Sequence, residues 1–485
     1  MKTLRQLLEE SKYTVWGNME GLDSSVNDIV YNSAKASEGT VFVCIKGERS
    51  NGHDFADNAY RSGARLFLCE ERLSLPKDAT QIIVSDTRKE LAKISAEFFS
   101  HPEKKLKLIG ITGTKGKTSV CAMITHIMEK AGKSVASIGT VGIKIGADTQ
   151  ATENSTPESY ILYKNFAKMV ELGVEYVVME VSSQALFKSR VDGMLFSAAV
   201  YTNLSSDHIG DGEHPSFEHY KECKKRLFAY ADVAFLNGDD IFSSEFASSI
   251  ACPIFSYGFS AGHDISAGDT LHFRKSDVFG VSFSVVIHGR RYGVDLPLPG
   301  DFSVYNALAA IAVCTHFGIS PELCANALCD VRVRGRFEII PSHLKDVVCI
   351  VDYAHNAESI SSVLRAMREY DPIRIICIFG SVGGRTKHRR REMALAANEL
   401  ADICIVTSDN PDSEPAEEII GEIAAYISPE KCVCITDRAD AVRYALKIAE
   451  RGDFVIFAGK GHEEYQLIDG KKLPFSEREL IEEFI

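Results

Sequence analysis

The stretch that decides the fold is Leu106-Lys107-Leu108-Ile109-Gly110-Ile111-Thr112-Gly113-Thr114-Lys115-Gly116-Lys117-Thr118. Its apolar first half predicts a buried strand, and residues 118–130 predict a helix. A glycine-rich turn between a strand and a helix can wrap phosphate oxygens with backbone N–H groups and the helix N-terminus. Within such a loop we expect Lys117 to neutralise the β- and γ-phosphates of ATP and Thr118 to hold Mg²⁺. The whole predicted nucleotide loop is Gly113, Thr114, Lys115, Gly116, Lys117, Thr118 and Ser119.

The loop is shorter than the usual phosphate-loop pattern, because Ile111 stands five residues before Gly116 and the leading glycine is Gly113. An ordinary strand-to-helix turn is therefore an alternative interpretation. The strand–turn–helix context favours a phosphate site.

Composition limits the classes of function. With 54 Lys and Arg against 67 Asp and Glu, the net charge of -13 argues against a nucleic-acid binder with a broad basic face. One dense basic cluster, residues 387–391, suits a phosphate-facing patch and a solvated helix face equally well. The 13 cysteines include no CxxC pair, and no apolar run approaches the roughly 18 residues of a membrane span. We expect a cytoplasmic protein without disulfides or membrane spans.

Strand-like and helix-like segments alternate along the chain, which predicts an α/β fold. A charged hinge at 101–105 and a fresh start of the alternation near Gly335 divide the chain into three expected domains. These are an N-terminal α/β domain (1–103), a central P-loop-type ATPase domain with a mostly parallel sheet (104–334) and a C-terminal Rossmann-like domain (335–485).

Two polar residues follow apolar strands of the central segment. Glu180 and His208 each come where an open α/β sheet exposes its ligand site. Taken singly, Glu180 could cap a helix and His208 could be a surface histidine.

Together with the loop at 112–118, these residues resemble the Mur ligases and their relative folylpolyglutamate synthase. The resemblance extends over nearly the whole chain and implies that Glu180 and His208 ligate a second Mg²⁺. It also implies that Lys224, in the segment 219–228, is carbamylated and becomes a further metal ligand. A partly buried lysine can become neutral and capture CO₂. The alternative is a solvated basic stripe, since Lys225 and Arg226 follow immediately.

The same resemblance implies further nucleotide contacts from Asn306, Arg336, Asp352 and His355. Asn306 lies in a segment in which Ser303 replaces the first asparagine of the family pattern.

The N-terminal segment is similar to the uridine-binding domain of the family members that add the third amino acid. Only Ser33 of its Asn32-Ser33-Ala34 stretch carries over, because those members have Asp-Ser-Arg there. The implied contacts to the UDP-linked precursor come from Ser33, Asn154, Ser155, Thr156, Ser182, Gln184 and Arg190.

For the incoming amino acid, the resemblance implies contacts from Arg385, Asp409, Asn410, Asp412, Gly459 and Glu463. Arg385 would hold the α-carboxylate and Glu463 would recognise the α-amine. Asp412 stands where diaminopimelate-adding members have Arg, and a carboxylate there would repel a distal carboxylate and suit a distal ammonium. We therefore predict L-lysine, with meso-diaminopimelate or another diamino acid as the alternative. Asp412 could instead point to solvent or cap a helix beginning near Pro415.

The implied activity is that of an ATP-dependent ligase in peptidoglycan biosynthesis. It would add the amino acid to the D-glutamate of UDP-MurNAc-L-Ala-D-Glu through an acyl phosphate, with UDP-MurNAc-dipeptide and a free amino acid as substrates. Rival interpretations are a folylpolyglutamate synthase-like ligase, a silent binding protein and a simple NTPase switch. A monomer with no nucleic-acid partner is expected.

Overall fold

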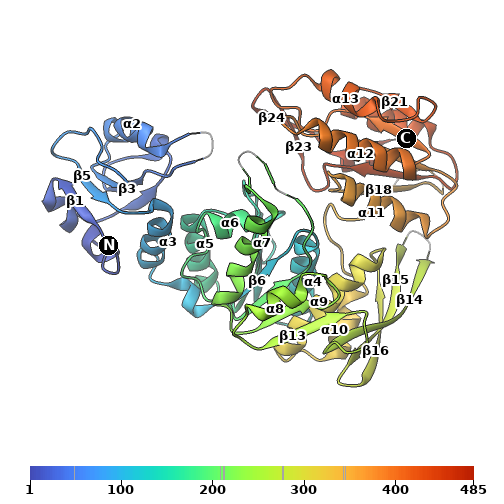
Figure 1. Ribbon diagram of the computed structural model, residues 1–485, viewed down its shortest axis with the longest axis horizontal. Helices are drawn as coiled ribbons and strands as arrows, with labels where there is room; N and C mark the ends of the chain where they lie inside the picture. Colours follow the sequence, from blue (N-terminus) through green and yellow to red (C-terminus); the bar gives the residue numbers. More distant parts are fainter. Residues whose placement is uncertain are drawn as a thin grey trace. The chain divides into compact units, whose positions relative to one another are not determined.

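The computed structural model describes the chain except residues 48–49, 208, 211–212, 276–277, 342, 345 and 485. Contacts divide it into two compact units, one of residues 1–264 and 312–319 and the other of residues 265–311 and 320–485 (Figure 1). His208, expected to ligate metal, lies outside the described residues.

The first unit begins with a five-stranded sheet of order β1-β5-β4-β3-β2, in which only β1 runs antiparallel to its neighbour. Successive residues of β3 face opposite sides, so that Val41 joins one core and Phe42 another. Helices α1 and α3 cover the first face and α2 covers the second. The elements are β1 (Thr14–Gly17), β2 (Asp28–Val30), β3 (Thr40–Val43), β4 (Leu66–Cys69), β5 (Thr80–Ile83), α1 (Leu4–Leu7), α2 (Ala56–Arg61) and α3 (Thr87–Phe98).

The same unit holds a larger sheet whose strands follow the order β13-β12-β11-β6-β10-β7-β8-β9. It is parallel from β13 to β7 and antiparallel beyond. Its strands are β6 (Lys107–Thr112), β7 (Val135–Gly139), β8 (Gly142–Ile145), β9 (Asp148–Gln150), β10 (Tyr176–Glu180), β11 (Ala198–Tyr201), β12 (Ala234–Asn237) and β13 (Ile254–Gly258). Its helices are α4 (Lys117–Lys130), α5 (Ser159–Glu171), α6 (Ser183–Phe187), α7 (Phe217–Lys225) and α8 (Ser243–Ser248). Because β10, β6 and β11 are neighbours, their carboxyl ends meet at one edge, where open α/β sheets bind ligands.

The second unit contains an antiparallel run of β14 (Ile265–Lys275), β15 (Val278–Ile287) and β16 (Arg290–Leu296), then α9 (Asp301–His316), which ends in the first unit, and α10 (Pro321–Leu328). A six-stranded sheet of order β17-β18-β22-β19-β20-β21 follows, parallel except for β17. Its strands are β17 (Glu338–Ile340), β18 (Val348–Asp352), β19 (Ile375–Phe379), β20 (Ile403–Val406), β21 (Cys432–Cys434) and β22 (Phe454–Ala458). Around it lie α11 (Ala357–Arg368), α12 (Lys387–Leu400), α13 (Ala416–Ala424), α14 (Arg438–Ile448), α15 (Glu477–Glu483) and the hairpin of β23 (Tyr465–Ile468) and β24 (Lys471–Pro474).

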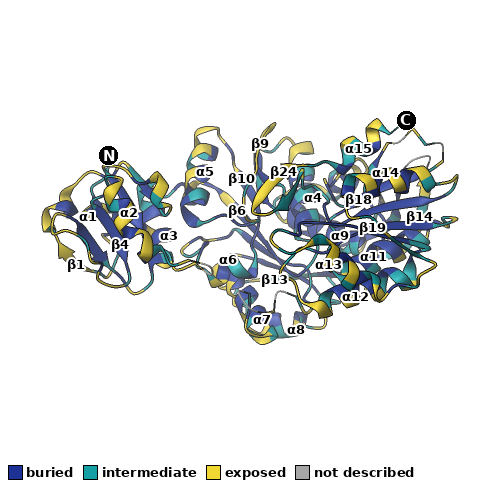
Figure 2. Cartoon of the chain, turned by 90° about the horizontal axis from the view of Figure 1, so that it is seen from above, coloured by how far each residue is buried: buried dark blue, intermediate teal, exposed yellow. Residues whose placement is uncertain are grey.

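The predicted α/β class is confirmed. Strands β18 and β19 (Figure 2) and strand β22 are buried throughout, as parallel strands covered on both faces must be. The three-domain division at 103 and 334 stays a prediction.

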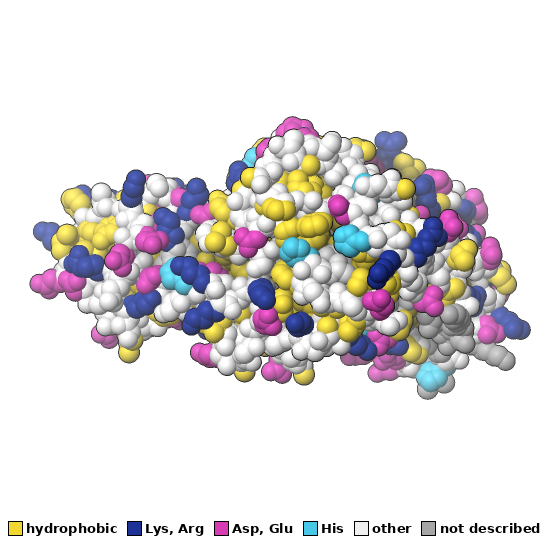
Figure 3. Space-filling model, turned by 90° about the horizontal axis from the view of Figure 1, so that it is seen from below, with side chains coloured by type: hydrophobic (Ala, Val, Ile, Leu, Met, Phe, Trp, Pro, Cys, Tyr) yellow, Lys and Arg dark blue, Asp and Glu magenta, His cyan; other side chains and the backbone are white. Residues whose placement is uncertain are grey.

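The surface and the cysteines agree with the composition. On the face drawn in Figure 3, acidic and basic side chains are interspersed and do not gather by sign. No disulfide links any of the 13 cysteines, all of which are described. Among the described helices, none has the length and hydropathy needed to cross a membrane.

Candidate active site

The predicted nucleotide loop closes tightly over the end of β11. Gly113 has φ +150°, and a Cβ there would lie 1.9 Å from Thr202 Oγ1. The backbone N–H groups of Thr114 and Lys115 donate to Asn203 O and Oδ1, both at 2.9 Å. These bonds fix the turn that precedes α4.

At the start of α4, Gly116 has φ +83°, a left-handed conformation that favours glycine. The Lys117 ammonium donates to the carbonyls of Gly113 (2.9 Å) and Thr114 (3.0 Å). The loop therefore combines a helix N-terminus with a lysine at its mouth, which is the arrangement that binds anionic phosphates.

Glu180, at the end of β10, is 1% exposed and held by two threonines. Its Oε1 accepts from Thr118 Oγ1 (3.0 Å) and from Thr140 N (2.8 Å), and its Oε2 accepts from Thr140 Oγ1 (3.1 Å). Gly139 leaves room for this carboxylate, since a Cβ there would lie 2.4 Å from Glu180 Oε1. Because Ser182 is the N-cap of α6, the helix-cap interpretation of Glu180 is wrong.

Thr140 and Gly139 were not expected from the sequence. The only signal is that Gly139 ends the apolar strand β7, next to β10 in the sheet, and that Thr140 follows it directly. The hydroxyl and carboxylate oxygens of Thr118 and Glu180 are the ligands that Mg²⁺ prefers, so this donor set suits the metal that the family implies.

Lys224, on α7, is 1% exposed, and its ammonium donates to Gly113 O at 2.7 Å. The ammonium also lies 4.4 Å from the centroid of the Tyr220 ring. Burial lowers the pKa of Lys224 well below its usual value, and the Lys117 ammonium lowers the pKa further. Lys225 instead pairs with Glu222 and Glu245. The basic-stripe interpretation is therefore wrong for Lys224.

Some of the expected precursor-binding residues gather beside Glu180. Thr156 Oγ1 donates to Glu180 O (2.9 Å) and accepts from Ser182 N (3.1 Å). Arg190 Nη1 donates to Thr156 O (2.9 Å), and Arg190 Nε donates to Glu158 Oε1 (2.9 Å).

The Gln184 amide is buried, and neither its oxygen nor its nitrogen has a hydrogen-bond partner within the described chain. Because buried amides are nearly always paired, Gln184 is a strong candidate for a ligand contact. Ser33 begins a 3₁₀ turn, Ser155 is half-buried and Asn154 is exposed. The structure gives no reason to group Ser33 with the residues around Glu180.

In the second unit, the carboxyl end of β18 carries several expected nucleotide contacts. Asp352 Oδ2 accepts from Phe337 N (2.8 Å), and the Arg336 guanidinium lies 4.7 Å from the Tyr353 ring centroid. His355 Nδ1 lies 2.8 Å from Tyr353 O.

Asn306 lies on α9 and is buried. Ser303, which replaces the first asparagine of the pattern, donates to Pro299 O at 2.7 Å. Ser303 therefore fixes the start of its own helix.

A buried polar cluster joins Asn410 and Glu463. Lys460, 1% exposed on its side chain, donates to Asn410 Oδ1 (2.7 Å) and Glu463 Oε2 (2.8 Å), and lies 3.5 Å from Asp409 Oδ1. Desolvation by burial raises the pKa of Glu463 most, but the Lys460 ammonium, the Asn410 hydrogen bond and His462 together bring that pKa below its usual value. Lys460 was not expected, although it stands between Gly459 and Gly461.

Asp412 is tied to the hairpin of β23 and β24. Its φ is +53°, its N–H donates to Leu467 O (3.0 Å), and its Oδ1 accepts from Gly470 N (2.9 Å). Helix α13 has Pro415 as N-cap and no side-chain cap, so the interpretation of Asp412 as its cap is wrong.

The basic cluster at 387–391 opens α12, after the exposed Arg385 and the N-cap residue Thr386. Arg390 is 2% exposed and pairs with Glu414 (2.6 Å) and Glu422 (2.7 Å). Arg390 therefore fits neither the phosphate-patch nor the solvated-face interpretation, because it joins α12 to α13. Lys387 does lie on a solvated helix face, beside Glu422.

Comparison with known proteins identifies the family of the chain. Family models match residues 25–101 (Mur ligase family, catalytic domain), 111–314 (Mur ligase middle domain) and 335–461 (Mur ligase, glutamate ligase domain). The UDP-N-acetylmuramoyl-L-alanyl-D-glutamate--2,6-diaminopimelate ligase of Caldanaerobacter subterraneus subsp. tengcongensis is 40% identical over 485 residues, covering 99% of this chain and 98% of the relative. The enzyme of that name from Geobacillus kaustophilus is 39% identical, covering 92% of each chain.

Among solved structures, one of a UDP-N-acetylmuramoyl-L-alanyl-D-glutamate--2,6-diaminopimelate ligase is 26% identical, with a TM-score of 0.65 and 94% coverage of both chains. The structure of a MurF ligase from Thermotoga maritima in complex with ADP is 20% identical, with a TM-score of 0.62. The match covers 90% of this chain and 94% of that one, which shows that the two share a fold. The chain belongs to the Mur ligase family of ATP-dependent ligases.

Proposed function

We propose that the protein joins a diamino acid to the γ-carboxylate of the D-glutamate in UDP-MurNAc-L-Ala-D-Glu, with ATP as the energy source. The observation that carries the proposal is the cluster of Lys224, Glu180 and Thr118 around the loop at Gly113. The names of relatives that match almost the whole chain support this substrate class.

The reaction has two steps. The γ-carboxylate attacks the γ-phosphorus of ATP, ADP leaves, and an acyl phosphate forms. The amine of the incoming amino acid then attacks the acyl carbon, loses a proton, and phosphate departs as the amide bond forms. Both steps build negative charge, which Lys117 and the N-terminus of α4 are placed to stabilise. Two bound Mg²⁺ ions would supply further charge neutralisation, one held by Thr118 and the second by Glu180, His208 and a carbamate on Lys224.

The carbamate is part of the proposal. The Lys224 ammonium first loses a proton, and the neutral amine then joins CO₂ and releases a second proton, so that a cation becomes an anion. Burial and the nearby Lys117 ammonium favour the neutral amine that this step needs.

For the precursor, we assign the acidic peptide to Arg190, Thr156 and the unpaired amide of Gln184, and the uridine end to Ser33. Asn154, Ser155 and Ser182 would line the same path. The nucleotide would further contact Asn306, Arg336, Asp352 and His355.

For the amino acid, we assign the α-amine to Glu463, with Asp409, Asn410 and Gly459 around it, and the α-carboxylate to Arg385. L-lysine is the proposed substrate, since Asp412 brings a carboxylate where an arginine would be needed for a distal carboxylate. The diaminopimelate named in the relatives is the alternative.

A panel assay tests the function. The purified protein is incubated with ATP, Mg²⁺, UDP-MurNAc-L-Ala-D-Glu and one amino acid, which is L-lysine, L-ornithine or meso-diaminopimelate in separate reactions. The mass of the UDP-linked product is measured by mass spectrometry. We expect a product one lysine residue heavier than the precursor, with ADP and phosphate in equal amounts. ATP hydrolysis without product would indicate an NTPase switch, and no turnover would indicate a silent protein. In a parallel reaction with a folate and L-glutamate in place of the precursor and the amino acid, glutamate added to the folate would indicate the rival ligase.

We further propose three domains (1–103, 104–334, 335–485), a monomeric chain and a cytoplasmic location. The absence of disulfides among the 13 cysteines supports a reducing compartment.

A further inference from the structure

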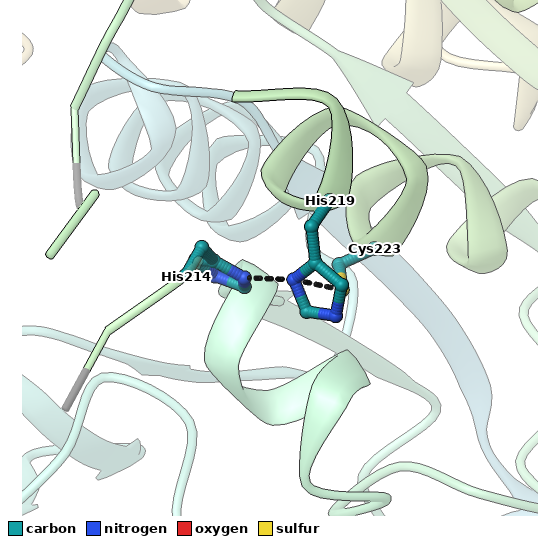
Figure 4. A group of neighbouring side chains, drawn as sticks. All are labelled: His214, His219 and Cys223. Atoms are coloured by element: carbon teal, nitrogen blue, oxygen red, sulfur yellow. Dashed lines mark hydrogen bonds between the residues drawn. The ribbon is translucent and has the colours of Figure 1, made fainter. Parts of the chain in front are cut away.

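We propose that His214, His219 and Cys223 form a binding site for a thiophilic divalent cation, with zinc as the expected metal, distinct from the magnesium site. One ligand atom from each of the three residues lies within 4.8 Å of the others (Figure 4). His219 and Cys223 are four residues apart on α7 and so share one face of the helix. His214 approaches from the segment before the helix (Figure 4).

The distances suit a tetrahedral metal. His214 Nδ1 lies 2.9 Å from His219 Nδ1, which is 3.8 Å from Cys223 Sγ. Zinc bonds of about 2.0–2.3 Å put nitrogen pairs roughly 3.3 Å apart and nitrogen–sulfur pairs roughly 3.6 Å apart. These two pairs therefore need shifts of only a few tenths of an ångström, and the third pair, His214 and Cys223, lies within 4.8 Å and would close further on binding.

The donor types select the metal. Imidazole nitrogen and thiolate sulfur bind zinc and its neighbours in the transition series, whereas Mg²⁺ prefers oxygen. The nucleotide's magnesium therefore does not suit this cluster. Binding would release the thiol proton of Cys223 to solvent, and the imidazole proton between the two Nδ1 atoms would move to Nε2 of its own ring, so that both Nδ1 atoms are free to bind the ion.

The residues around the three ligands also favour a metal site. The second ring nitrogen of His214, Nε2, lies 2.8 Å from Ser183 Oγ, and metal-binding histidines are commonly oriented by such a contact. The Phe187 ring packs edge-on against His219, with centroids 4.8 Å apart. His214 is 0% exposed and Cys223 is 0% exposed, so little water competes for the ion.

The site would act on the loop through Tyr220. The His214 ring packs against Tyr220, with centroids 5.2 Å apart, and the Tyr220 hydroxyl donates to Thr114 Oγ1 at 3.1 Å. Lys224 directly follows Cys223 on α7. An ion at this position would stiffen the N-terminal end of α7 and the contact between α7 and the nucleotide loop.

Cobalt tests the proposal without substrate or nucleotide, so its outcome is independent of the ligase activity. Metal-stripped full-length protein is titrated with Co²⁺ alone, and absorption is followed in the near ultraviolet and visible range. We expect one equivalent to bind, with a thiolate-to-cobalt charge-transfer band and tetrahedral visible bands that Zn²⁺ then abolishes. Zn²⁺ should also raise the melting temperature of the wild type.

The matched variants are Cys223→Ser, His219→Ala and Ser183→Ala, with Cys252→Ser as control because Cys252 is a half-buried thiol outside the cluster. Cys223→Ser should remove the charge-transfer band, His219→Ala should weaken binding strongly, and Ser183→Ala should weaken it about ten- to a hundredfold. The control should behave as the wild type. His219 is only partly buried, so its variant is expected to fold, and far-ultraviolet circular dichroism checks this. A wild type without the band, or a band that persists in both Cys223→Ser and His219→Ala, overturns the proposal.

Discussion

At the scale of single residues, Lys117 is the cation that we place beside the phosphates of ATP. Its ammonium donates to two backbone carbonyls of the loop, Gly113 O and Thr114 O. Lys117→Ala should lower ATP turnover at least roughly a hundredfold, because it removes the charge that stabilises the transferring phosphate. It touches no apolar core, so the melting temperature should stay near the wild-type value. Steady-state kinetics and thermal melts check both, and near-normal turnover would remove Lys117 from the nucleotide site.

Lys224 gives a second prediction, with Lys225 as a matched control on the same helix. Lys224→Ala should be nearly inactive, and short carboxylic acids should partly restore its activity by taking the place of the carbamate. Lys225→Ala should keep its activity, because Lys225 pairs with Glu222 and Glu245 near the surface. An active Lys224→Ala variant, together with native mass spectra that show only the free amine, would contradict the carbamate.

At the scale of secondary-structure elements, the hairpin of β23 and β24 determines what Asp412 can do. Asp412→Asn keeps an oxygen for the Gly470 N–H group but loses the charge, whereas Asp412→Arg loses both. If the charge recognises the amino acid, the wild type prefers L-lysine to meso-diaminopimelate. Asp412→Asn should reduce this preference by about ten- to a hundredfold, the equivalent of a charge-assisted hydrogen bond.

Measuring kcat/KM for both amino acids on the three proteins checks this prediction. An unchanged ratio in Asp412→Asn with a lowered melting temperature in Asp412→Arg would mean that Asp412 serves the hairpin alone.

The elements also show what the sequence could and could not predict. Strands such as β18 and β22 were predicted because buried parallel strands are continuous apolar runs. The β23–β24 hairpin was missed, although Asp469-Gly470 is a turn signal and both residues have positive φ. The contact of Thr140 with Glu180 joins residues 40 positions apart, and no local pattern encodes such a distance. The sequence therefore predicted which residue types lie at the site, but it did not predict their hydrogen-bond partners.

At the scale of the whole molecule, the chain has two compact units with separate cores. Chains of this kind commonly depart from two-state unfolding. We expect two calorimetric transitions, one for each unit.

A variant in each unit tests this expectation. Arg438, 0% exposed, bonds Glu477 (2.7 Å), Ser408 O (3.1 Å) and Ala458 O (2.8 Å), all in the second unit. Arg438→Met leaves the Glu477 carboxylate buried without its cation and should cost about 3–5 kcal/mol. Phe166→Ala should cost a similar amount, about 3–5 kcal/mol, in a core of the first unit. Differential scanning calorimetry should show each variant lowering a different transition, and a single transition lowered by both would contradict independent units.

Gly113 of the nucleotide loop and Gly139 of β7 have no room for a side chain, and this limits how resistance to an inhibitor can arise. A side chain at Gly113 would collide with Thr202 Oγ1, and one at Gly139 would collide with the Glu180 carboxylate. A compound that gains its affinity from the backbone at these two positions would leave the protein few single substitutions that abolish inhibition. A substitution that displaced the compound would also displace groups on which the proposed chemistry depends. Resistance to such a compound should therefore arise through export or overproduction of the enzyme more often than through changes in the site itself.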